Sequence, residues 1–396
     1  MTKIIGVVGG GIIGLAIAYK LQKKYPGSKV HLFEKEARIG LHQSGRNSGV
    51  LHCGLYYEPG SLKAALAVSG IEQMTEFCRI QGISHEICGK VVVASNEKEA
   101  GYLDKLAFRG EKNGLQGLKF LTKAELKERE PFVSASKSLL VPKEGLVDYK
   151  MVMERLSGLI TDAGGQIHFS TEVTAVRETE NQLILSSNSQ TWNVDLLVNC
   201  AGLHSDRVFQ KFTGKIRPLR IVPFRGEYMM LKPEASHLVN HLVYPVPDPE
   251  YPFLGIHFTR MINGSREVGP NAVFAFKREG YTNRDFSLKD TLDSVTYKGF
   301  MNFLAKNFAF SLGELRSSLS ESVFIKKAQK LIPDINTSHL VKGTAGVRAQ
   351  AMDSSGKLLM DFNVIREGNQ VHVLNAPSPG ATAALAIADH VITNYI

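Results

Sequence analysis

Three glycines near the N-terminus have the spacing of a loop that holds a dinucleotide. Gly9, Gly11 and Gly14 form the pattern G-x-G-x-x-G between a β-rich run, Ile4–Val8, and a helical pattern. Glycine permits a tight turn here and lets the amides of a helix N-terminus approach a pyrophosphate closely. Glu34 follows Gly14 by twenty residues, where a carboxylate can accept both hydroxyls of a ribose. We predict a dinucleotide site rather than an ordinary strand-to-helix turn.

Two later segments favour a flavin over a nicotinamide. Residues 195–202 have the pattern of a buried strand that ends in a small-residue turn, which resembles the second strand of two-domain flavoproteins. Residues 375–388 place a glycine-rich turn before a helix, whose amides would stabilise negative charge on a flavin pyrimidine ring. The alternative is a final helix that only packs on the sheet. We predict FAD as the cofactor, held by Gly9, Gly11, Ile12, Ile13, Gly14, Glu34, Lys35, Ser44, Asn47, Ser48, Val173, Ala201, Gly202, Pro379, Gly380, Ala381 and Thr382.

The elements that must position these residues alternate between strand and helix. We expect helices at Ile12–Lys24, Leu62–Gln81 and 149–163, and strands at 29–34, 90–95, 166–169, 182–186, 195–199, 358–363 and 370–374. Residues 217–281 have the alternation of antiparallel strands, and residues 286–330 are amphipathic and helical. The predicted fold class is α/β: a Rossmann-like FAD-binding domain (1–85, 150–216 and 335–396) with an α+β, antiparallel-sheet substrate domain (86–149 and 217–334).

Charge and cysteine content restrict the possible partners. The formal charge of +9 is dispersed, without a run of five basic residues, so we expect no nucleic acid; an anionic membrane surface stays possible. The four cysteines form no CxxC pair, so we expect no metal site and no disulfide framework. The chain enters a strand at once, and no run of 18 apolar residues is present. We expect a cytoplasmic protein and leave open its peripheral attachment to the inner face of the membrane.

The loop at 42–64, HQSGRNSGVLHCGLYYEPGSLKA, resembles that of L-2-hydroxyglutarate oxidases and dehydrogenases in the D-amino-acid-oxidase-like superfamily. The resemblance continues through GLVDY (145–149), PFRGEY (223–228), YPVPDPEYPFLGIHFTR (244–260), GPNAVFAFKREGY (269–281), GTAGVRAQ (343–350) and APSPGAT (376–382). Arg46 and Cys53 stand where a His and an Ala are expected in many relatives. The resemblance implies that (S)-2-hydroxyglutarate is oxidised to 2-oxoglutarate by hydride transfer from C2 to flavin N5. Oxygen or a membrane quinone would then take the electrons.

Oxidation of a secondary alcohol needs a base that removes the hydroxyl proton, and histidine suits this at neutral pH. His52 and His257 lie in the similar segments, and the prediction favours His257 as the base. His52 lies in the loop where some related amine dehydrogenases attach the flavin covalently. Either histidine could instead be a hydrogen-bonded core residue.

A five-carbon dicarboxylate needs cationic clamps, for which the planar fork of arginine is well suited. Arg348, in a glycine-rich segment, and Arg260 are the predicted clamps. Arg260 is three residues after the favoured histidine, so the two point to opposite faces of a regular strand unless a bulge intervenes. Lys63 and Arg225 are further candidates, and Tyr57 is a candidate hydroxyl donor. Each of them could also be a solvated or packing residue.

Two other functions stay open at this point. A sister flavoprotein that oxidises an amine or glycerol 3-phosphate would share the nucleotide motifs. A flavin-fold binding or escort protein without redox activity would keep the fold alone.

Overall fold

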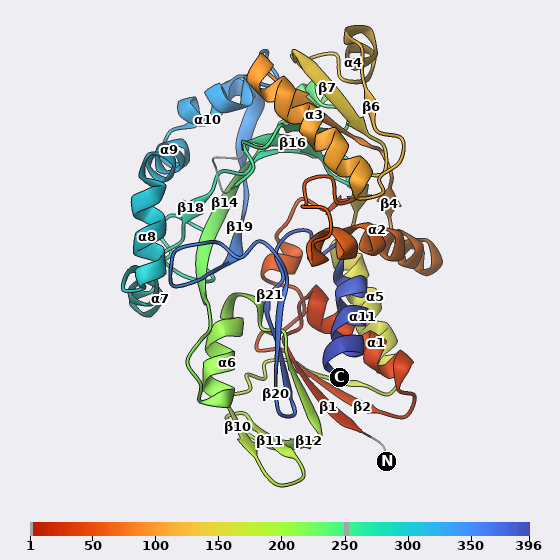
Figure 1. Ribbon diagram of the computed structural model, residues 1–396, viewed down its shortest axis with the longest axis vertical. Helices are drawn as coiled ribbons and strands as arrows, with labels where there is room; N and C mark the ends of the chain where they lie inside the picture. The colour runs from red at the N-terminus through yellow and green to blue at the C-terminus, as the bar shows by residue number, and fades with distance from the viewer. Residues whose placement is uncertain (1–2, 249–252) are drawn as a thin grey trace.

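Two lobes are stacked along the long axis of the molecule (Figure 1) in a computed structural model that describes residues 3–248 and 253–396. Part of the segment at 244–260 therefore lies outside the described residues. The lower lobe holds both chain termini. The upper lobe is built from the insertions between the segments of the lower one.

The lower lobe contains a sheet of six described strands, all parallel to their neighbours except the edge strand β20. In spatial order they are β20 (Asn363–Glu367), β21 (Gln370–Asn375), β13 (Leu196–Asn199), β1 (Ile4–Val8), β2 (Lys29–Phe33) and β9 (Gln166–His168). One face packs against α1 (Ile12–Lys24), α5 (Tyr149–Asp162) and α11 (Ala384–Tyr395). A three-stranded antiparallel sheet of β10 (Ala175–Glu178), β11 (Leu183–Ser186) and β12 (Thr191–Val194) packs on the other. The predicted α/β fold class is confirmed.

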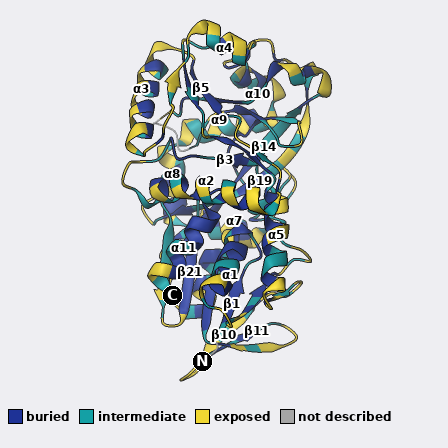
Figure 2. Cartoon of the chain, turned by 90° about the vertical axis from the view of Figure 1, so that its right-hand side faces the viewer, coloured by how far each residue is buried: buried dark blue, intermediate teal, exposed yellow. Residues whose placement is uncertain are grey.

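Burial explains why this part folds as the sequence predicts. Both faces of β1 are covered, so its residues are almost uniformly apolar, as is usual in a parallel sheet. Helix α1 is bounded by Gly11 and Tyr25, and it buries a continuous apolar run from Leu15 to Ala18. Figure 2 shows the same distribution, with buried residues on the sheet and on the inner sides of α1 and α11.

The upper lobe is organised around a mainly antiparallel sheet whose described strands number nine. They are β18 (Val273–Phe274), β14 (Arg220–Leu231), β17 (Arg266–Gly269), β16 (His257–Arg260), β15 (Leu242–Pro245), β5 (Lys90–Ala94), β7 (Lys137–Val141) and β6 (Lys119–Phe120), with β19 (Leu340–Met352) paired on β14. Helix α3 (Glu97–Lys112) packs on β5 and β7. Helices α7 (Leu288–Val295), α8 (Lys298–Lys306), α9 (Phe308–Leu319) and α10 (Glu321–Ala328) follow one another along the edge of the molecule (Figure 1).

The two lobes meet at a small three-stranded sheet and at two helices. A small sheet consists of β3 (Val50–Leu51), β8 (Gly145–Val147) and β4 (His85–Glu86). Helix α2 (Leu62–Gln81) packs on α11, and α6 (Ser205–Thr213) packs beside β21. Helix α4 (Lys123–Arg129) begins with a capping box between Thr122 and Glu125 at the far end of the upper lobe.

The strand predicted at 358–363 is wrong. Leu358 makes an isolated bridge to Met352, and the strand itself begins at Asn363. The reason is a side chain: the Asn375 amide donates to the carbonyls of Leu359 and Asp361, which therefore do not take part in a sheet.

Strand β19 pairs with β14 from Leu340 to Met352, with one irregularity between Glu227 and Met229. It thus extends the upper sheet, although the sequence places residues 335–396 with the nucleotide-binding segments. The two-domain division at the predicted boundaries stays a proposal.

Candidate active site

A cavity of about 1270 Å³ runs from the carboxyl ends of the parallel strands into the upper lobe. This is the edge at which open parallel sheets bind ligands. Every predicted cofactor residue lines the cavity except Gly14, and so do His52, His257, Arg348, Tyr57 and Lys63. Gly14 lies behind the wall, where a Cβ atom would sit 2.0 Å from the carbonyl oxygen of Gly9.

The nucleotide end is formed by the turn from β1 to α1. Gly9 has φ +114°, and a Cβ atom there would lie 2.4 Å from the Cys200 carbonyl oxygen, so only glycine fits. Gly11 is the N-cap of α1, and the first turn of the helix holds no acidic residue. Ser44 Oγ accepts from the Ile12 amide at 3.0 Å. The positive end of the helix thus faces the cavity, as a pyrophosphate requires.

Glu34 lies at the carboxyl end of β2 and is buried. Its Oε2 accepts from the Gly10 amide at 2.7 Å, and its Oε1 accepts from the Glu36 amide at 2.9 Å. Each carboxylate oxygen keeps a second acceptor site, so the side chain is oriented for ribose hydroxyls.

The far wall of the nucleotide end is the turn at 379–382 before α11. The amides of Ala381 and Thr382 make no hydrogen bond to any described residue, although both residues line the cavity. Thr382 Oγ1 accepts from the His52 amide at 3.2 Å and lies 2.7 Å from the Tyr149 hydroxyl, which fixes the turn against the loop at 42–64. Two free donors at this end fit an anionic or electron-rich ring.

At the upper end, the three candidate arginines have different surroundings. Arg348 on β19 lines the cavity, and its Nη1 is buried without a partner among the described residues. Arg260 instead pairs with Glu86 on β4, and Arg225 bonds to Glu227 and the Thr282 carbonyl. Neither is among the described residues that line the cavity. The Arg348 guanidinium lies 5.6 Å from the centre of the Phe253 ring, and its buried Nη1 lacks an acceptor that an anion in the cavity would supply.

Both candidate histidines reach the cavity. His257 Nδ1 donates to the Gly255 carbonyl at 2.9 Å, and the ring stacks on Tyr244 with centroids 4.0 Å apart. Burial is the main cause that lowers the pKa of His257 to about 3, although the bond to Gly255 acts in the opposite direction. His52 Nδ1 lies 3.2 Å from Glu144 Oε2.

Lys63 and Tyr57 adjoin each other at the side of the cavity. The Lys63 ammonium lies 4.7 Å from the centre of the Tyr57 ring. Burial lowers the pKa of Lys63 to about 8, although Asp361 acts in the opposite direction. A lysine that is partly neutral near pH 8 gains charge when an anion approaches it.

Sequence reasoning missed a buried ion pair beside His52. Lys90 Nζ, on β5, lies 2.8 Å from Glu144 Oε1, in the turn before β8. A lysine that opens an otherwise apolar strand, in KVVVA, was the available signal. Nothing local identified Glu144 as its partner.

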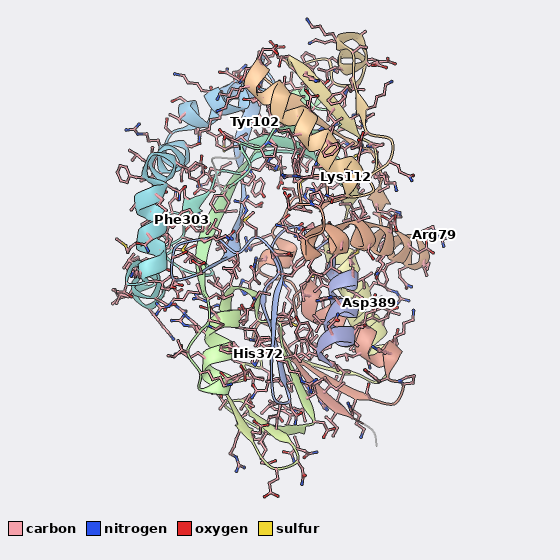
Figure 3. All side chains as sticks on the ribbon, viewed as in Figure 1. Arg79, Tyr102, Lys112, Phe303, His372 and Asp389 are labelled. Atoms are coloured by element: carbon pink, nitrogen blue, oxygen red, sulfur yellow. The ribbon has the colours of Figure 1, made fainter. Side chains whose placement is uncertain are left out.

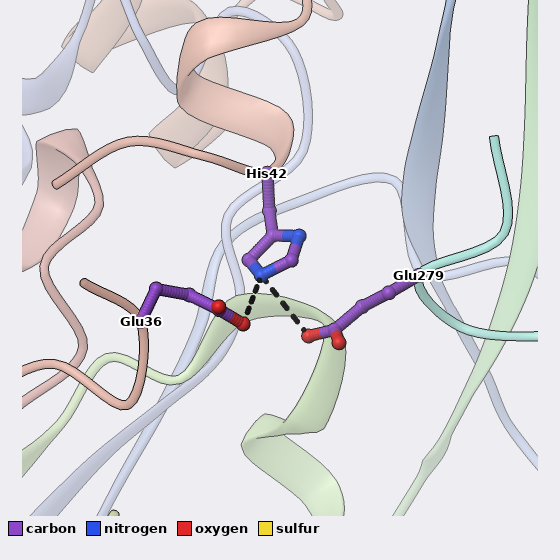
Figure 4. A group of neighbouring side chains, drawn as sticks. All are labelled: Glu36, His42 and Glu279. Carbon is purple, nitrogen blue, oxygen red and sulfur yellow. Dashed lines mark hydrogen bonds and ion pairs between the residues drawn. The ribbon is translucent and has the colours of Figure 1, made fainter. Parts of the chain in front are cut away.

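Figure 4 shows a second cluster, Glu36, His42 and Glu279, at the rim of the nucleotide end. His42 Nε2 lies 3.1 Å from Glu36 Oε1 and 3.2 Å from Glu279 Oε1, a spacing that could suit a metal. The Lys35 ammonium, however, lies 2.8 Å from the same Glu279 oxygen and also pairs with Glu36. The carboxylates are already neutralised, so the cluster is an ion-pair network that joins the two lobes.

The parallel sheet, the open helix N-terminus and the adjoining cavity define a two-lobed α/β protein with a dinucleotide-type site. The sequence profile of the family described as "FAD dependent oxidoreductase" matches residues 5–393. The chain therefore belongs to this family, and its cofactor is FAD. The relatives to which it is similar in sequence are L-2-hydroxyglutarate dehydrogenases. The resemblance stated from the sequence is confirmed.

Three relatives illustrate the similarity. The chain is 44% identical over 381 residues to an L-2-hydroxyglutarate dehydrogenase of Indibacter alkaliphilus, with 96% of each chain covered. It is 41% identical to that of Escherichia coli K12, covering 98% of this chain and 92% of the relative. Identity to the mitochondrial human enzyme of the same name is 40%, with 97% and 86% covered.

Solved structures share the fold. L-α-glycerophosphate oxidase from Mycoplasma pneumoniae, with FAD bound, has a TM-score of 0.79 at 23% identity and covers 99% of this chain and 94% of its own. Glycine oxidase from Geobacillus kaustophilus has a TM-score of 0.71 at 20% identity, with 99% and 94% covered. Within residues 3–248 and 253–396, none of the helices combines the length and apolarity that a membrane crossing requires.

Proposed function

We propose that this flavoprotein oxidises L-2-hydroxyglutarate, the (S)-isomer, to 2-oxoglutarate. The observation that carries the proposal is the buried Nη1 of Arg348, which has no hydrogen-bond partner among the described residues, in a cavity that two histidines also line. Relatives that are 40–44% identical over nearly their whole length bear the name of this activity. Bound FAD supplies the acceptor for the hydride that leaves C2.

Binding of the dicarboxylate is assigned to cations of the upper end. Arg348 receives one carboxylate, because its fork has free donors and no competing acid. Lys63 receives the other, with the Tyr57 hydroxyl as a further donor, since both line the same cavity. Arg260 and Arg225 are left out of the proposed clamp because acidic partners already hold them.

For the base, the geometry favours His52 over His257. The low pKa of His257 makes it a weak proton acceptor, and its bond to Gly255 has no charge to stabilise an imidazolium. His52 Nδ1 instead faces the carboxylate of Glu144. We assign proton removal to His52 Nε2 and positioning of the substrate to neutral His257.

Anaerobic reduction of the flavin tests the substrate. The holoenzyme is mixed with L-2-hydroxyglutarate, D-2-hydroxyglutarate, glycerol 3-phosphate and glycine, and the absorbance of oxidised flavin is followed. Rapid bleaching by L-2-hydroxyglutarate alone is expected. Bleaching by glycerol 3-phosphate or glycine instead would reassign the substrate, and a purified protein that takes up no flavin after reconstitution would favour a binding protein.

The proposed electron acceptor is a quinone dissolved in a membrane with anionic lipids. The protein would dock peripherally on the cytoplasmic face of that membrane. The support is an exposed apolar stripe on α7 and α9. It consists of Leu288, Leu292 and Val295, spaced i, i+4, i+7, and of Phe308, Leu312, Leu315 and Leu319, spaced i, i+4, i+7, i+11. Helix α8 lies between these two helices in the chain, and its Phe303 (Figure 3) is not part of the stripe, because the side chain points inward to Phe224, with 5.7 Å between the ring centroids.

The charges beside the stripe suit an anionic bilayer. Arg284, Lys298, Lys306 and Arg316 are exposed and have no ion pair with the described residues. The acids of α7, Asp290 and Asp293, face inward and pair with Arg207. Apolar side chains rimmed by basic ones bind the interface of anionic membranes.

Two measurements test the acceptor and the docking surface. Substrate-reduced enzyme is mixed with oxygen or with a short-chain quinone in a stopped-flow instrument, and faster reoxidation by the quinone is expected. In flotation assays, the protein should bind vesicles with phosphatidylglycerol and lose binding in the double variant Phe308→Ser/Leu319→Ser. The control Ile216→Ser removes an exposed apolar residue elsewhere. Faster reoxidation by oxygen, or unchanged flotation of the double variant, would contradict this proposal.

A further inference from the structure

The pair of Lys90 and Glu144 is buried completely, with both residues 0% exposed. Removing two charges from water costs more than their attraction usually returns, so such a pair is weak evidence for a stabilising role. The pair lies behind the lining of the active-site cavity, in contact with His52, which does line it. Its position calls for a role in the chemistry.

The two oxygens of Glu144 have separate partners. Oε1 lies 2.8 Å from the Lys90 ammonium and accepts weakly from the amide of Cys53 at 3.5 Å. Oε2 lies 3.2 Å from His52 Nδ1. One carboxylate thus connects the Lys90 side chain to the imidazole of His52.

Both residues of the pair are held rigidly. The Gly89 amide donates to the Glu144 carbonyl at 2.8 Å, which ties the turn before β8 to the start of β5. The Lys90 ammonium lies 4.3 Å and 4.9 Å from the ring centres of Tyr56 and Tyr244. Aromatic faces stabilise a cation that water cannot reach.

We propose that Glu144 and Lys90 are positioning residues for His52: the carboxylate fixes the imidazole with its proton on Nδ1, and the ammonium keeps the carboxylate ionised. This inference rests on the proposed function, in which His52 is the base. The hydroxyl proton of the substrate passes to His52 Nε2, the Nδ1 proton stays in place, and the C2 hydride leaves with its electron pair to FAD. Glu144 takes up no proton; it stabilises the imidazolium that forms.

Electrostatics agree with this geometry. Burial alone would raise the pKa of Glu144, but Lys90 and His52 outweigh burial and hold the pKa at about 2. The carboxylate is therefore charged throughout the working pH range. A buried carboxylate without Lys90 would tend to take up a proton and lose its hold on the imidazole.

The test uses the holoenzyme variant Glu144→Gln, whose amide oxygen can still accept from Nδ1 but carries no charge. We expect the acid limb of the kcat/KM profile to move to lower pH by about 1–2 units, because the imidazolium loses its counter-charge. At the plateau, kcat should fall by roughly 10²-fold. The other titratable or charged groups that face this site are Lys90 on β5, Tyr244 on β15, His257 on β16, Arg348 on β19, and Cys53, Tyr56 and Tyr57 in the loop at 42–64.

Two further variants separate this role from folding. Lys90→Met/Glu144→Gln removes both charges, so it should fold and bind flavin even if the single variant does not, and it should move the acid limb in the same direction by a smaller amount. Glu130→Gln is the matched control. Glu130 is also buried and lies 2.9 Å from His241 Nδ1, away from the described cavity lining, so it should leave the limb in place.

A second readout does not depend on turnover. In holoenzyme with ¹⁵N-labelled histidine, the His52 resonance, assigned through His52→Asn, should show the Nδ1-protonated tautomer and an Nδ1 chemical shift that changes in the variants, which lack the carboxylate. The inference is overturned if, in the double variant, the acid limb stays within about 0.3 pH units of the wild type and the Nδ1 chemical shift of His52 does not change. Failure of the proposed function has a different signature, namely no flavin bleaching by L-2-hydroxyglutarate in the wild type.

Discussion

The two ends of the cavity recognise their ligands with different parts of the chain. The nucleotide end presents backbone amides and a carboxylate from two adjacent turns, with glycines where any side chain would collide. The upper end presents side chains of His52, His257 and Arg348, which come from three separate segments of the chain, with Glu144 behind His52. The first end depends on local backbone shape, and the second depends on how distant strands pack.

This difference has a consequence for mutation. A change at the nucleotide end should remove the cofactor and with it every activity. A change at the upper end should leave a normal flavin spectrum and alter only the reaction of the substrate. Flavin content and turnover, measured together, therefore distinguish the two ends.

The largest effect is expected from Gly14→Ala. Its Cβ would lie 2.0 Å from the Gly9 carbonyl oxygen, so α1 would have to move away from the nucleotide turn. We expect bound flavin, measured by the ratio of visible to ultraviolet absorbance, to fall to about a tenth or less. Gly158→Ala on α5 is the control, because its Cβ meets nothing closer than Arg155 at 4.0 Å. Full flavin content in Gly14→Ala would show that the turn tolerates a side chain.

Arg348→Met should have the next largest effect, with the flavin retained. Loss of a bidentate carboxylate contact should lower kcat/KM for L-2-hydroxyglutarate by roughly 10²-fold, mainly through KM. Arg260→Met is the matched control from the same sheet, and it should change kcat/KM by less than about threefold, since its partner is Glu86. A larger loss in Arg260→Met than in Arg348→Met would reverse the assignment of the clamp.

The smallest effect concerns the dependence of stability on pH. Burial is the main cause that lowers the pKa of His257 to about 3 and that of His372, on β21 (Figure 3), to about 4. The unfolded chain binds these protons below about pH 6.5 and the folded chain does not. The free energy of unfolding should therefore fall as pH drops from 6.5 to 4.5, by roughly 1 kcal/mol per histidine at pH 5.5.

Thermal unfolding between pH 7 and 4.5 measures this dependence. His372→Asn should reduce the slope, while the exposed His237→Asn should not. An equal slope in His372→Asn would show that this histidine does not contribute. Burial alone would raise the pKa of Asp293 and of Glu279, but the arginines that bond to Asp293 hold its pKa well below the usual range, and His204 and Lys35 hold the pKa of Glu279 at about 2. Both carboxylates therefore lose their contribution only at lower pH.

The sequence by itself determined the nucleotide end. The spacing of Gly9, Gly11 and Gly14, the acid at Glu34 and the helix at Ile12–Lys24 are all local features, and they correspond to the observed turn and helix. These features can be predicted from the sequence because glycine is required wherever two backbone segments touch, so the steric requirement of the turn is visible in the spacing of the glycines.

Tertiary structure alone decided the upper end. The sequence favours Arg348 over Arg260 only through strand parity and a glycine-rich neighbourhood, whereas the fold shows that Arg260 pairs with Glu86 and that Nη1 of Arg348 has no partner among the described residues. Lys90 and Glu144 are separated by more than fifty residues and meet only through the pairing of β5 with β7 and the turn before β8. Burial and the identity of a charge's partner are properties of the assembled fold, and no spacing along the chain encodes them.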